Sequence, residues 1–227
     1  MKALKLTSFL ILTLIYVSCE KVKNDDPFSG HVLYLSFQDA SGNDLVEGIG
    51  YDWLQSDIVP EEEYAWGGRV NPDLYTLKII FPEGAVDVND KSLWSGIRDP
   101  RDTIGPTIVL AKPYNENMKF TNLYFEPYDG YEAHKEFWEA MGGYYRLWMW
   151  THSKIEDNVK KLIFRITCPY IFGDDQAHDI VTYWRKSDKN RANGKACYRI
   201  EFEGKEVTDI SYADYEQMSF ATIVLDR

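Results

Sequence analysis

Alternation between apolar and polar side chains constrains this sequence more than any other feature. Such alternation is typical of β-strands, because successive side chains along a strand point to opposite faces of the sheet. The clearest alternating segments are 31–37, 75–81, 162–168 and 196–203. Shorter candidates are 107–111, 118–125, 180–184 and 220–225, while 144–150 is apolar on both faces, as in a central strand. The pattern predicts an all-β fold, an antiparallel β-sandwich of immunoglobulin-like or similar architecture.

One segment breaks the alternation and predicts a helix. Asp129 and Glu132 have the spacing of a helix N-cap and its partner. Phe137 and Met141 then repeat at helical spacing, and a glycine follows directly as a terminator. We therefore expect one short helix over 131–141, inserted between strands.

The first 18 residues are organised like an export signal. Lys2 and Lys5 precede an apolar run over 6–17. This run is too short for a membrane-spanning helix, which needs about 20 apolar residues. It ends in the sequence Tyr16-Val17-Ser18-Cys19. An ordinary signal peptide with an incidental cysteine is one interpretation of this ending.

The ending also resembles the lipobox of bacterial lipoproteins, in which a small residue precedes a cysteine that becomes lipidated and N-terminal. The resemblance implies a signal peptide over 1–18 and a lipidated Cys19. Tyr16 departs from the family pattern, which usually has Leu at this position. The polar segment 19–27 then acts as a flexible tether. Together with an aromatic-rich β domain, these features are similar to the uncharacterised lipoproteins of Bacteroidetes-type bacteria.

This resemblance implies a location and an anchor but no activity. The expected location is the cell envelope, lipid-anchored to the outer membrane on its surface-exposed or periplasmic face. For 28–227 we expect a single β-sandwich domain, since no Pro-, Gly- or Ser-rich linker divides it. Two domains of about 100 residues, meeting near the predicted helix, are the alternative.

Charge and motifs exclude several function classes. The chain has 25 Lys and Arg against 36 Asp and Glu, a net charge of −11, so nucleic acid is not an expected partner. The sequence has no His-Glu-x-x-His, Gly-x-Ser-x-Gly, phosphate-loop or dinucleotide motif, and its four His residues are scattered. We therefore expect no catalytic residues and no cofactor.

The residues most similar to a metal site are Asp174, Asp175, His178 and Asp179. Oxygen ligands two to four residues apart on a loop suit a hard cation. However, a Ca²⁺ site normally needs about six to eight ligands, and this segment offers at most four. We interpret it as a solvated turn and expect no metal.

Two cysteines remain in the predicted domain. If the strands that carry Cys168 and Cys197 form a simple meander, the two thiols lie roughly 25 Å apart, whereas bridged Cα atoms lie within about 7 Å. Alternation places Cys168 inward and Cys197 outward beside Arg199. We expect unpaired thiols, with Cys197 exposed. Only a crossover that placed these strands in different sheets would permit a disulfide.

The tryptophans fall into two groups. Trp148, Trp150 and Trp184 lie in strand candidates and are expected to pack in the core. Trp53, Trp66 and Trp94 lie in segments dense in Asp, Glu, Gly or Ser. Loop aromatics beside acceptor-rich side chains suit a sugar ring, so these three are the candidate ligand-binding residues. The alternative is that each folds back as a lid on the core.

These features favour a lipid-anchored, non-catalytic binding module for a glycan or a partner protein. The first alternative is a structural or accessory subunit of an envelope assembly or adhesin. The second alternative is a polysaccharide-acting hydrolase that uses two of the many carboxylates. The sequence names no ligand and no oligomeric state.

Overall fold

The computed structural model describes residues 28–53, 68–81, 108–114, 120–122, 125–128, 135–154, 159–187, 195–213 and 216–227. The signal sequence, Cys19 and the tether lie outside the described residues, so their assignment remains a prediction. In the described part the protein is mostly β, as the alternation predicts.

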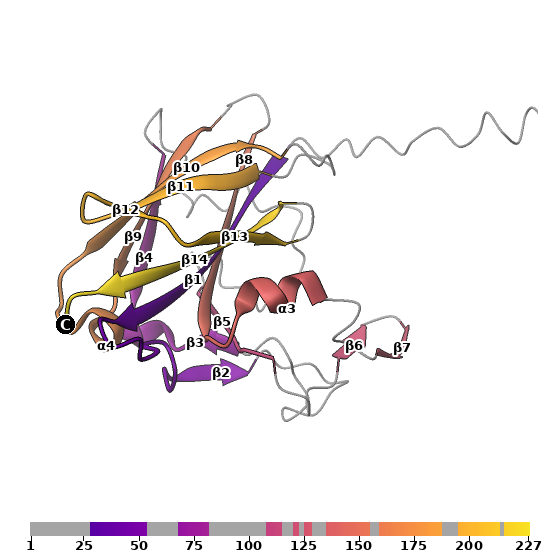
Figure 1. Cartoon of the computed structure of the whole chain (residues 1–227), viewed down its shortest axis with the longest axis horizontal. Helices are drawn as coiled ribbons and strands as arrows, with labels where there is room; N and C mark the ends of the chain where they lie inside the picture. Colours follow the sequence, from indigo (N-terminus) through magenta and orange to yellow (C-terminus); the bar gives the residue numbers. More distant parts are fainter. Residues whose placement is uncertain are drawn as a thin grey trace, which may run out of the picture.

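Twelve strands of the described residues form one sheet, and two more form a separate hairpin. Along the sheet the order is β2 (Tyr51–Trp53), β3 (Gly68–Val70), β5 (Val109–Ala111), β8 (Arg146–Lys154), β1 (Phe28–Asp39), β11 (Lys195–Phe202), β10 (His178–Lys186), β9 (Lys161–Thr167) and β4 (Thr76–Ile80). Off this path lie β12 (Lys205–Val207), β13 (Ile210–Ala213) and β14 (Met218–Leu225), and the hairpin is β6 (Phe120–Asn122) with β7 (Phe125–Tyr128). The sheet is curled and half-barrel-like, so the expected sandwich is not confirmed (Figure 1).

Strand β1 holds the two parts of the sheet together. It pairs antiparallel with β8 on one edge. On its other edge it meets β11 where His31 lies opposite Lys195, and then runs parallel to β14 over 32–39. The sheet is therefore mixed, and the predicted purely antiparallel arrangement was wrong. Alternation determines which side chains share a face, but it carries no information on the direction of the neighbouring strand.

The inward-facing side chains of the curled sheet form the main core. Leu33, Leu35 and Phe37 of β1 are fully buried in it, which confirms the face that alternation assigns to them. Strand β9 contributes the alternate positions of 162–166, also as predicted. Strand β8 lies between β5 and β1, so the prediction of a central strand near 144–150 is confirmed as well.

A second apolar cluster covers the other face of β1. Helix α3 (Lys135–Met141) places Phe137 against Tyr34, with ring centroids 5.5 Å apart. Tyr34 in turn stacks on Phe220 of β14 at 4.6 Å. Because helix and sheet bury apolar side chains against each other here, β1 is covered on both faces.

The predicted helix is confirmed where the structure describes it. Helix α3 covers the second part of the expected span 131–141, and 131–134 lie outside the described residues. Gly142 ends the helix with φ +62°, and its N–H donates to the Trp138 carbonyl at 3.2 Å. Two shorter turns were not predicted, the four-residue helix α4 (Pro169–Phe172) and the 3₁₀ turn η2 (Pro72–Leu74).

The prediction for Cys197 was wrong. Its side chain is fully buried, because a register shift between Tyr183 and Trp184 of β10 places Cys197 opposite Trp184 and Arg199 opposite Tyr183. Tyr198 is the extra residue of this bulge and is 49% exposed. Past the bulge the strand recovers the predicted faces.

The expectation of unpaired cysteines is confirmed. Cys168 and Cys197 are both free thiols, and both are buried. Strands β9, β10 and β11 form the expected antiparallel meander. Cys168 follows one end of it, beyond the pairing of Ile166 with His178, while Cys197 pairs near the opposite end.

Candidate binding cleft between β12 and β14

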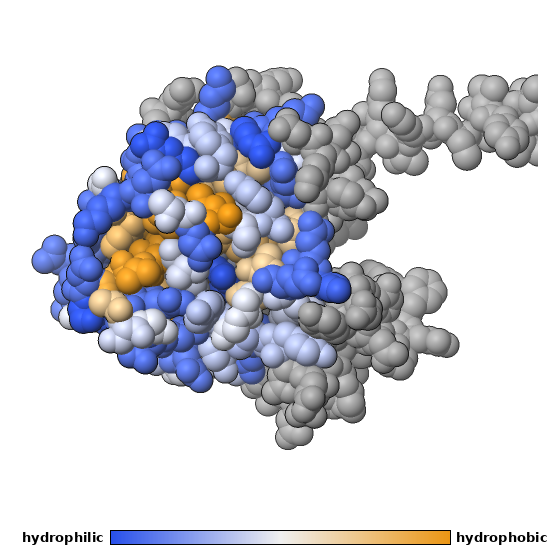
Figure 2. Space-filling view, in the orientation of Figure 1, coloured by the Kyte–Doolittle hydropathy of each residue, from blue (hydrophilic) through white to orange (hydrophobic). Residues whose placement is uncertain are grey.

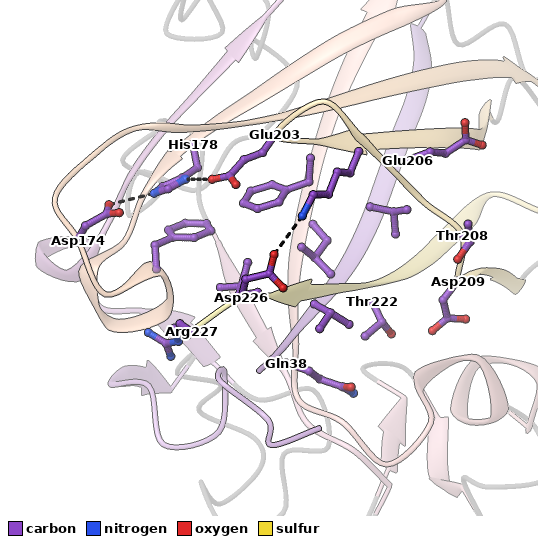
Figure 3. Close-up of a pocket in the computed structure, with 17 residues that line it drawn as sticks. Gln38, Asp174, His178, Glu203, Glu206, Thr208, Asp209, Thr222, Asp226 and Arg227 are labelled. Atoms are coloured by element: carbon purple, nitrogen blue, oxygen red, sulfur yellow. Dashed lines mark hydrogen bonds and ion pairs between the residues drawn. The ribbon is translucent and has the colours of Figure 1, made fainter. Parts of the chain in front are cut away.

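A cleft of about 500 Å³ opens between β12 and the end of β14. Figure 2 shows an apolar hollow on this face, bordered by hydrophilic side chains, and Figure 3 shows the residues that line the cleft. Its volume lies within the range of about 300–1,000 Å³ that is usual for ligand sites. We therefore take this cleft as the candidate functional site.

The cleft forms because β14 extends beyond its outer partner. Strand β13 pairs with β14 only over 218–221, after which the Thr222 N–H donates to the Asp209 carbonyl at 3.3 Å. The preceding strand, β12, pairs with β11 instead. The segment 205–213 thus crosses from β11 to β14, and the last residues of β14 face β12 across the cleft.

The floor of the cleft is an edge of the main core. It is made by apolar side chains from α4, β11, β12 and β14, which are Phe172, Phe202, Val207, Ile223 and Leu225. Val224 stands beside this floor and is 57% exposed, more than any other large apolar residue of the described part. A ligand in the cleft would remove this apolar surface from water.

The rim of the cleft is acidic. In the described residues five carboxylates line it, on Asp174, Glu203, Glu206, Asp209 and Asp226, against the cations Lys205 and Arg227. Lys205 is already paired, since its ammonium lies 3.0 Å from the Asp226 carboxylate, which raises the pKa of Lys205. The field over the cleft therefore favours a ligand with positive charge.

His178 is held between two of these carboxylates. Its Nε2 lies 3.0 Å from Asp174 Oδ1 and its Nδ1 lies 3.2 Å from Glu203 Oε1 (Figure 3). The hydrogen bond from His178, together with the Gln176 N–H, lowers the pKa of Asp174. The His178 ring also stacks on Phe172, with centroids 4.1 Å apart. Both ring nitrogens therefore face carboxylates.

A tight turn carries the Glu203 carboxylate. Glu203 and Gly204 connect β11 to β12 with φ values of 49° and 75°, the left-handed pair that a two-residue hairpin turn needs. Glycine supplies this conformation without strain, while Glu203 is one of only two non-glycine residues with positive φ in the described part. The strained residue is thus the one that contacts His178.

The structure divides the residues that most resembled a metal site. Asp174 and His178 line the cleft, whereas Asp179 makes two hydrogen bonds to Arg165, at 2.6 and 2.7 Å. His178 and Asp179 are consecutive on β10, so their side chains point to opposite faces. No group of three or more His, Cys, Asp or Glu residues suited to a metal ion occurs in the described part of the chain.

The tryptophan candidates are not brought to the cleft by any described contact. Trp53 is the last residue of β2 and pairs with Gly68 of β3. Trp66 and Trp94 lie outside the described residues. By contrast, Trp184 is buried in the main core, as expected of a strand tryptophan. Trp148 and Trp150 are half-buried, and Trp148 packs against the cluster that includes α3.

Sequence reasoning missed most of the cleft. Phe172 is placed by the short helix α4, which the spacing of Pro169 and Gly173 could have indicated, since proline favours the first helical position and glycine the C-terminal cap. Val224 gave no signal, because its exposure depends on where β13 stops. The sequence likewise does not indicate that β12 and β14 lie on opposite sides of one cleft, because this depends on tertiary structure.

Comparisons with known proteins add no family to this description. The chain matches no family model, no curated protein and no solved structure. None of the helices in the described residues is long and apolar enough to cross a membrane.

Proposed function

We propose that this protein is a non-catalytic binding module that holds a segment of a partner protein in the cleft between β12 and β14. The observation that carries the proposal is the cleft itself, with an apolar floor and an acidic rim. Apolar contact supplies affinity, and the carboxylates select against acidic partners.

The arrangement of polar groups favours binding over catalysis. Among the described residues that line the cleft, His178 is the one histidine, and both of its ring nitrogens contact carboxylates. The described part of the lining contains the hydroxyls of Thr208 and Thr222 but no serine or cysteine. Neither threonine hydroxyl is among the described contacts of His178, so no nucleophile is paired with a base.

The lipobox resemblance supports a place in the cell envelope, with the domain tethered through Cys19 to the outer membrane. A lipid anchor needs only a short tether to present a cleft to a neighbouring protein. A structural role in an envelope assembly or adhesin is a variant of the same proposal, in which the bound segment belongs to a permanent partner.

A glycan is the second candidate ligand, and a polysaccharide-acting hydrolase is the remaining alternative. The glycan hypothesis depends on Trp53, Trp66 and Trp94. The partner-protein hypothesis depends on the cleft. The two ligands therefore predict different sensitive residues.

The test is the melting temperature of the full-length purified chain with two sets of probes. One set is a pool of synthetic decapeptides of varied sequence and positive net charge, and the other is a panel of soluble polysaccharides. A ligand that binds only the folded state at ten times its Kd stabilises by about 1.4 kcal/mol, a shift of a few degrees. We expect the peptides to produce this shift.

Two matched variants locate the response. Val224→Arg places a cation in the cleft. Tyr198→Arg introduces the same cationic side chain at a similarly exposed strand position outside the cleft. We expect Val224→Arg to abolish the peptide shift and Tyr198→Arg to keep it. A polysaccharide shift that survives Val224→Arg but is lost in Trp53→Ala, Trp66→Ala or Trp94→Ala would overturn the proposal in favour of a glycan. Release of sugar products would favour the hydrolase.

A further inference from the structure

The outer edge of β14 offers unpaired backbone groups to the cleft. The bond from the Thr222 N–H to Asp209 directs the N–H and C=O of Thr222 toward β13. Backbone groups alternate in direction along a strand, so those of Val224 point to the same edge. Strand β13 has already ended there, and no backbone partner for Val224 is present among the described residues on that side.

The other side of β14 leads to the same conclusion. Phe37 C=O and Asp39 N–H of β1 bond to the 43–45 segment, away from β14. The backbone groups of Gln38, between them, therefore face β14. Gln38 lies opposite Val224 in this parallel ladder, where a residue bonds to the two neighbours of its opposite residue. The bonds of Gln38 thus go to 223 and 225, which leaves the Val224 groups directed outward.

Strand β12 presents a second edge across the cleft. Phe202 and Lys205 flank its two-residue turn and form the hydrogen-bonded pair of the hairpin. Glu206, the next residue, therefore directs its N–H and C=O away from β11 and toward the cleft side. Both Glu206 and Val224 line the cleft, so it lies between two strand edges.

An open edge next to an apolar floor suits an extended peptide. Main-chain hydrogen bonds to the edge give affinity to any sequence, and pockets for alternate side chains give specificity. The floor selects apolar side chains at alternate positions. The rim, with five carboxylates against two cations, selects Lys or Arg at the positions between them.

We infer that the partner segment binds as an added β-strand along β14, and that it is a basic peptide with alternating apolar and cationic side chains. This inference rests on the proposed function and specifies how the cleft is used. The backbone of Val224 supplies the donor and acceptor that the added strand pairs with.

The probe is an end-capped octapeptide of alternating valine and lysine, measured by fluorescence anisotropy with the full-length protein. Its controls are the valine–glutamate peptide and two N-methylated forms, one on every valine and one on every lysine. We expect the valine–lysine peptide to bind and the valine–glutamate peptide to bind at least tenfold more weakly. At least one N-methylated form should lose tenfold or more, because N-methylation removes the donors along one edge of the peptide.

Two protein variants test the edge directly. Val224→Pro removes the outward N–H and leaves the ladder to β1 intact, and proline is tolerated on edge strands. Val224→Ala shortens the side chain but keeps the donor. We expect a loss of at least tenfold for Val224→Pro and of less than threefold for Val224→Ala. If Val224→Pro does not fold, the N-methylated peptides still decide the question on the wild-type protein.

The outcomes separate this inference from the proposed function. If both N-methylated peptides bind as tightly as the parent, recognition uses side chains alone and strand addition is wrong, while the binding module stands. If the octapeptide does not bind but decapeptides of the pool do, the basic alternating pattern is wrong. If the wild-type protein is a dimer that Val224→Pro converts to a monomer, the edge pairs with a second copy and the inference is overturned.

Discussion

Cys197 lies opposite Trp184 in the ladder between β11 and β10, on the buried side of a bulge. The Cys197 N–H donates to the Ser219 hydroxyl at 2.9 Å, and the Trp184 Nε1–H donates to the Thr182 hydroxyl at 2.7 Å. This pairing places the Cys197 thiol inside the core, beside two buried hydrogen bonds to side-chain hydroxyls. The bulge therefore decides the reactivity of the cysteine.

Neither Cys168 nor Cys197 should react in the native protein at pH 8. Burial raises the pKa of the Cys197 thiol to about 12, and it also raises that of Cys168. A thiol with a pKa four units above the pH is about one ten-thousandth thiolate, and the thiolate is the reactive form. Iodoacetamide labelling with peptide-resolved mass spectrometry should leave both residues unmodified until denaturant is added. Rapid labelling of native Cys197 would show that the sequence-based exposure was right.

Arg146→Met should destabilise the fold by about 2–4 kcal/mol, because it leaves two buried carbonyls without their charged donor. The Arg146 guanidinium is 4% exposed and donates to the Met141 carbonyl at 2.9 Å and the Ala221 carbonyl at 2.7 Å. It thereby connects the end of α3 to β14. Burial lowers the pKa of Arg146 to about 10, while Asp209 and Asp44 act in the opposite direction.

The measurement for Arg146→Met is urea unfolding followed by circular dichroism. Arg165→Met is the matched control, since Arg165 is an exposed arginine paired with Asp179 and such pairs contribute little. Equal losses for the two variants would contradict the role given to Arg146.

Gly204→Ala should destabilise by about 1–2 kcal/mol through backbone strain alone. Gly204 has φ +75°, and a Cβ atom built there meets nothing within 4 Å. Gly143→Ala is the control, because its Cβ also meets nothing and its φ is outside the left-handed range. That change should be neutral or slightly stabilising. Thermal unfolding of both variants checks the difference, and an equal effect would show that turn geometry is not the cause.

Asp179→Asn should lose a small amount of stability, below about 1 kcal/mol, at neutral pH but not in acid. The hydrogen bonds from Arg165 lower the folded-state pKa of Asp179 below its usual 3.8. A lowered carboxyl pKa stabilises the fold above the unfolded-state value, and this contribution disappears as the pH falls through the folded-state value. The difference between wild type and variant should thus be constant above about pH 5 and shrink toward zero below pH 3.8. Urea unfolding at a series of pH values from 7 to 3 measures this difference in unfolding free energy. A difference that grows in acid would contradict the lowered pKa of Asp179.

The sequence by itself determined the local β structure and its buried faces. Alternation assigned Leu33, Leu35 and Phe37 of β1 to one face and Cys168 to the inside, because the period of two is a property of every strand. Phe137 and Met141 with the following glycine located α3 for the same local reason.

Tertiary structure decided everything that depends on which strands meet. The parallel pairing of β1 with β14 joins residues 186 positions apart, and the Ser36 hydroxyl donates to the buried Thr222 hydroxyl at 3.0 Å as one of its consequences. The bulge that buries Cys197 reflects how β11 fits β10, which alternation within one strand does not encode. The cleft depends on where β13 leaves β14, so the exposure of Val224 is a property of the assembled sheet.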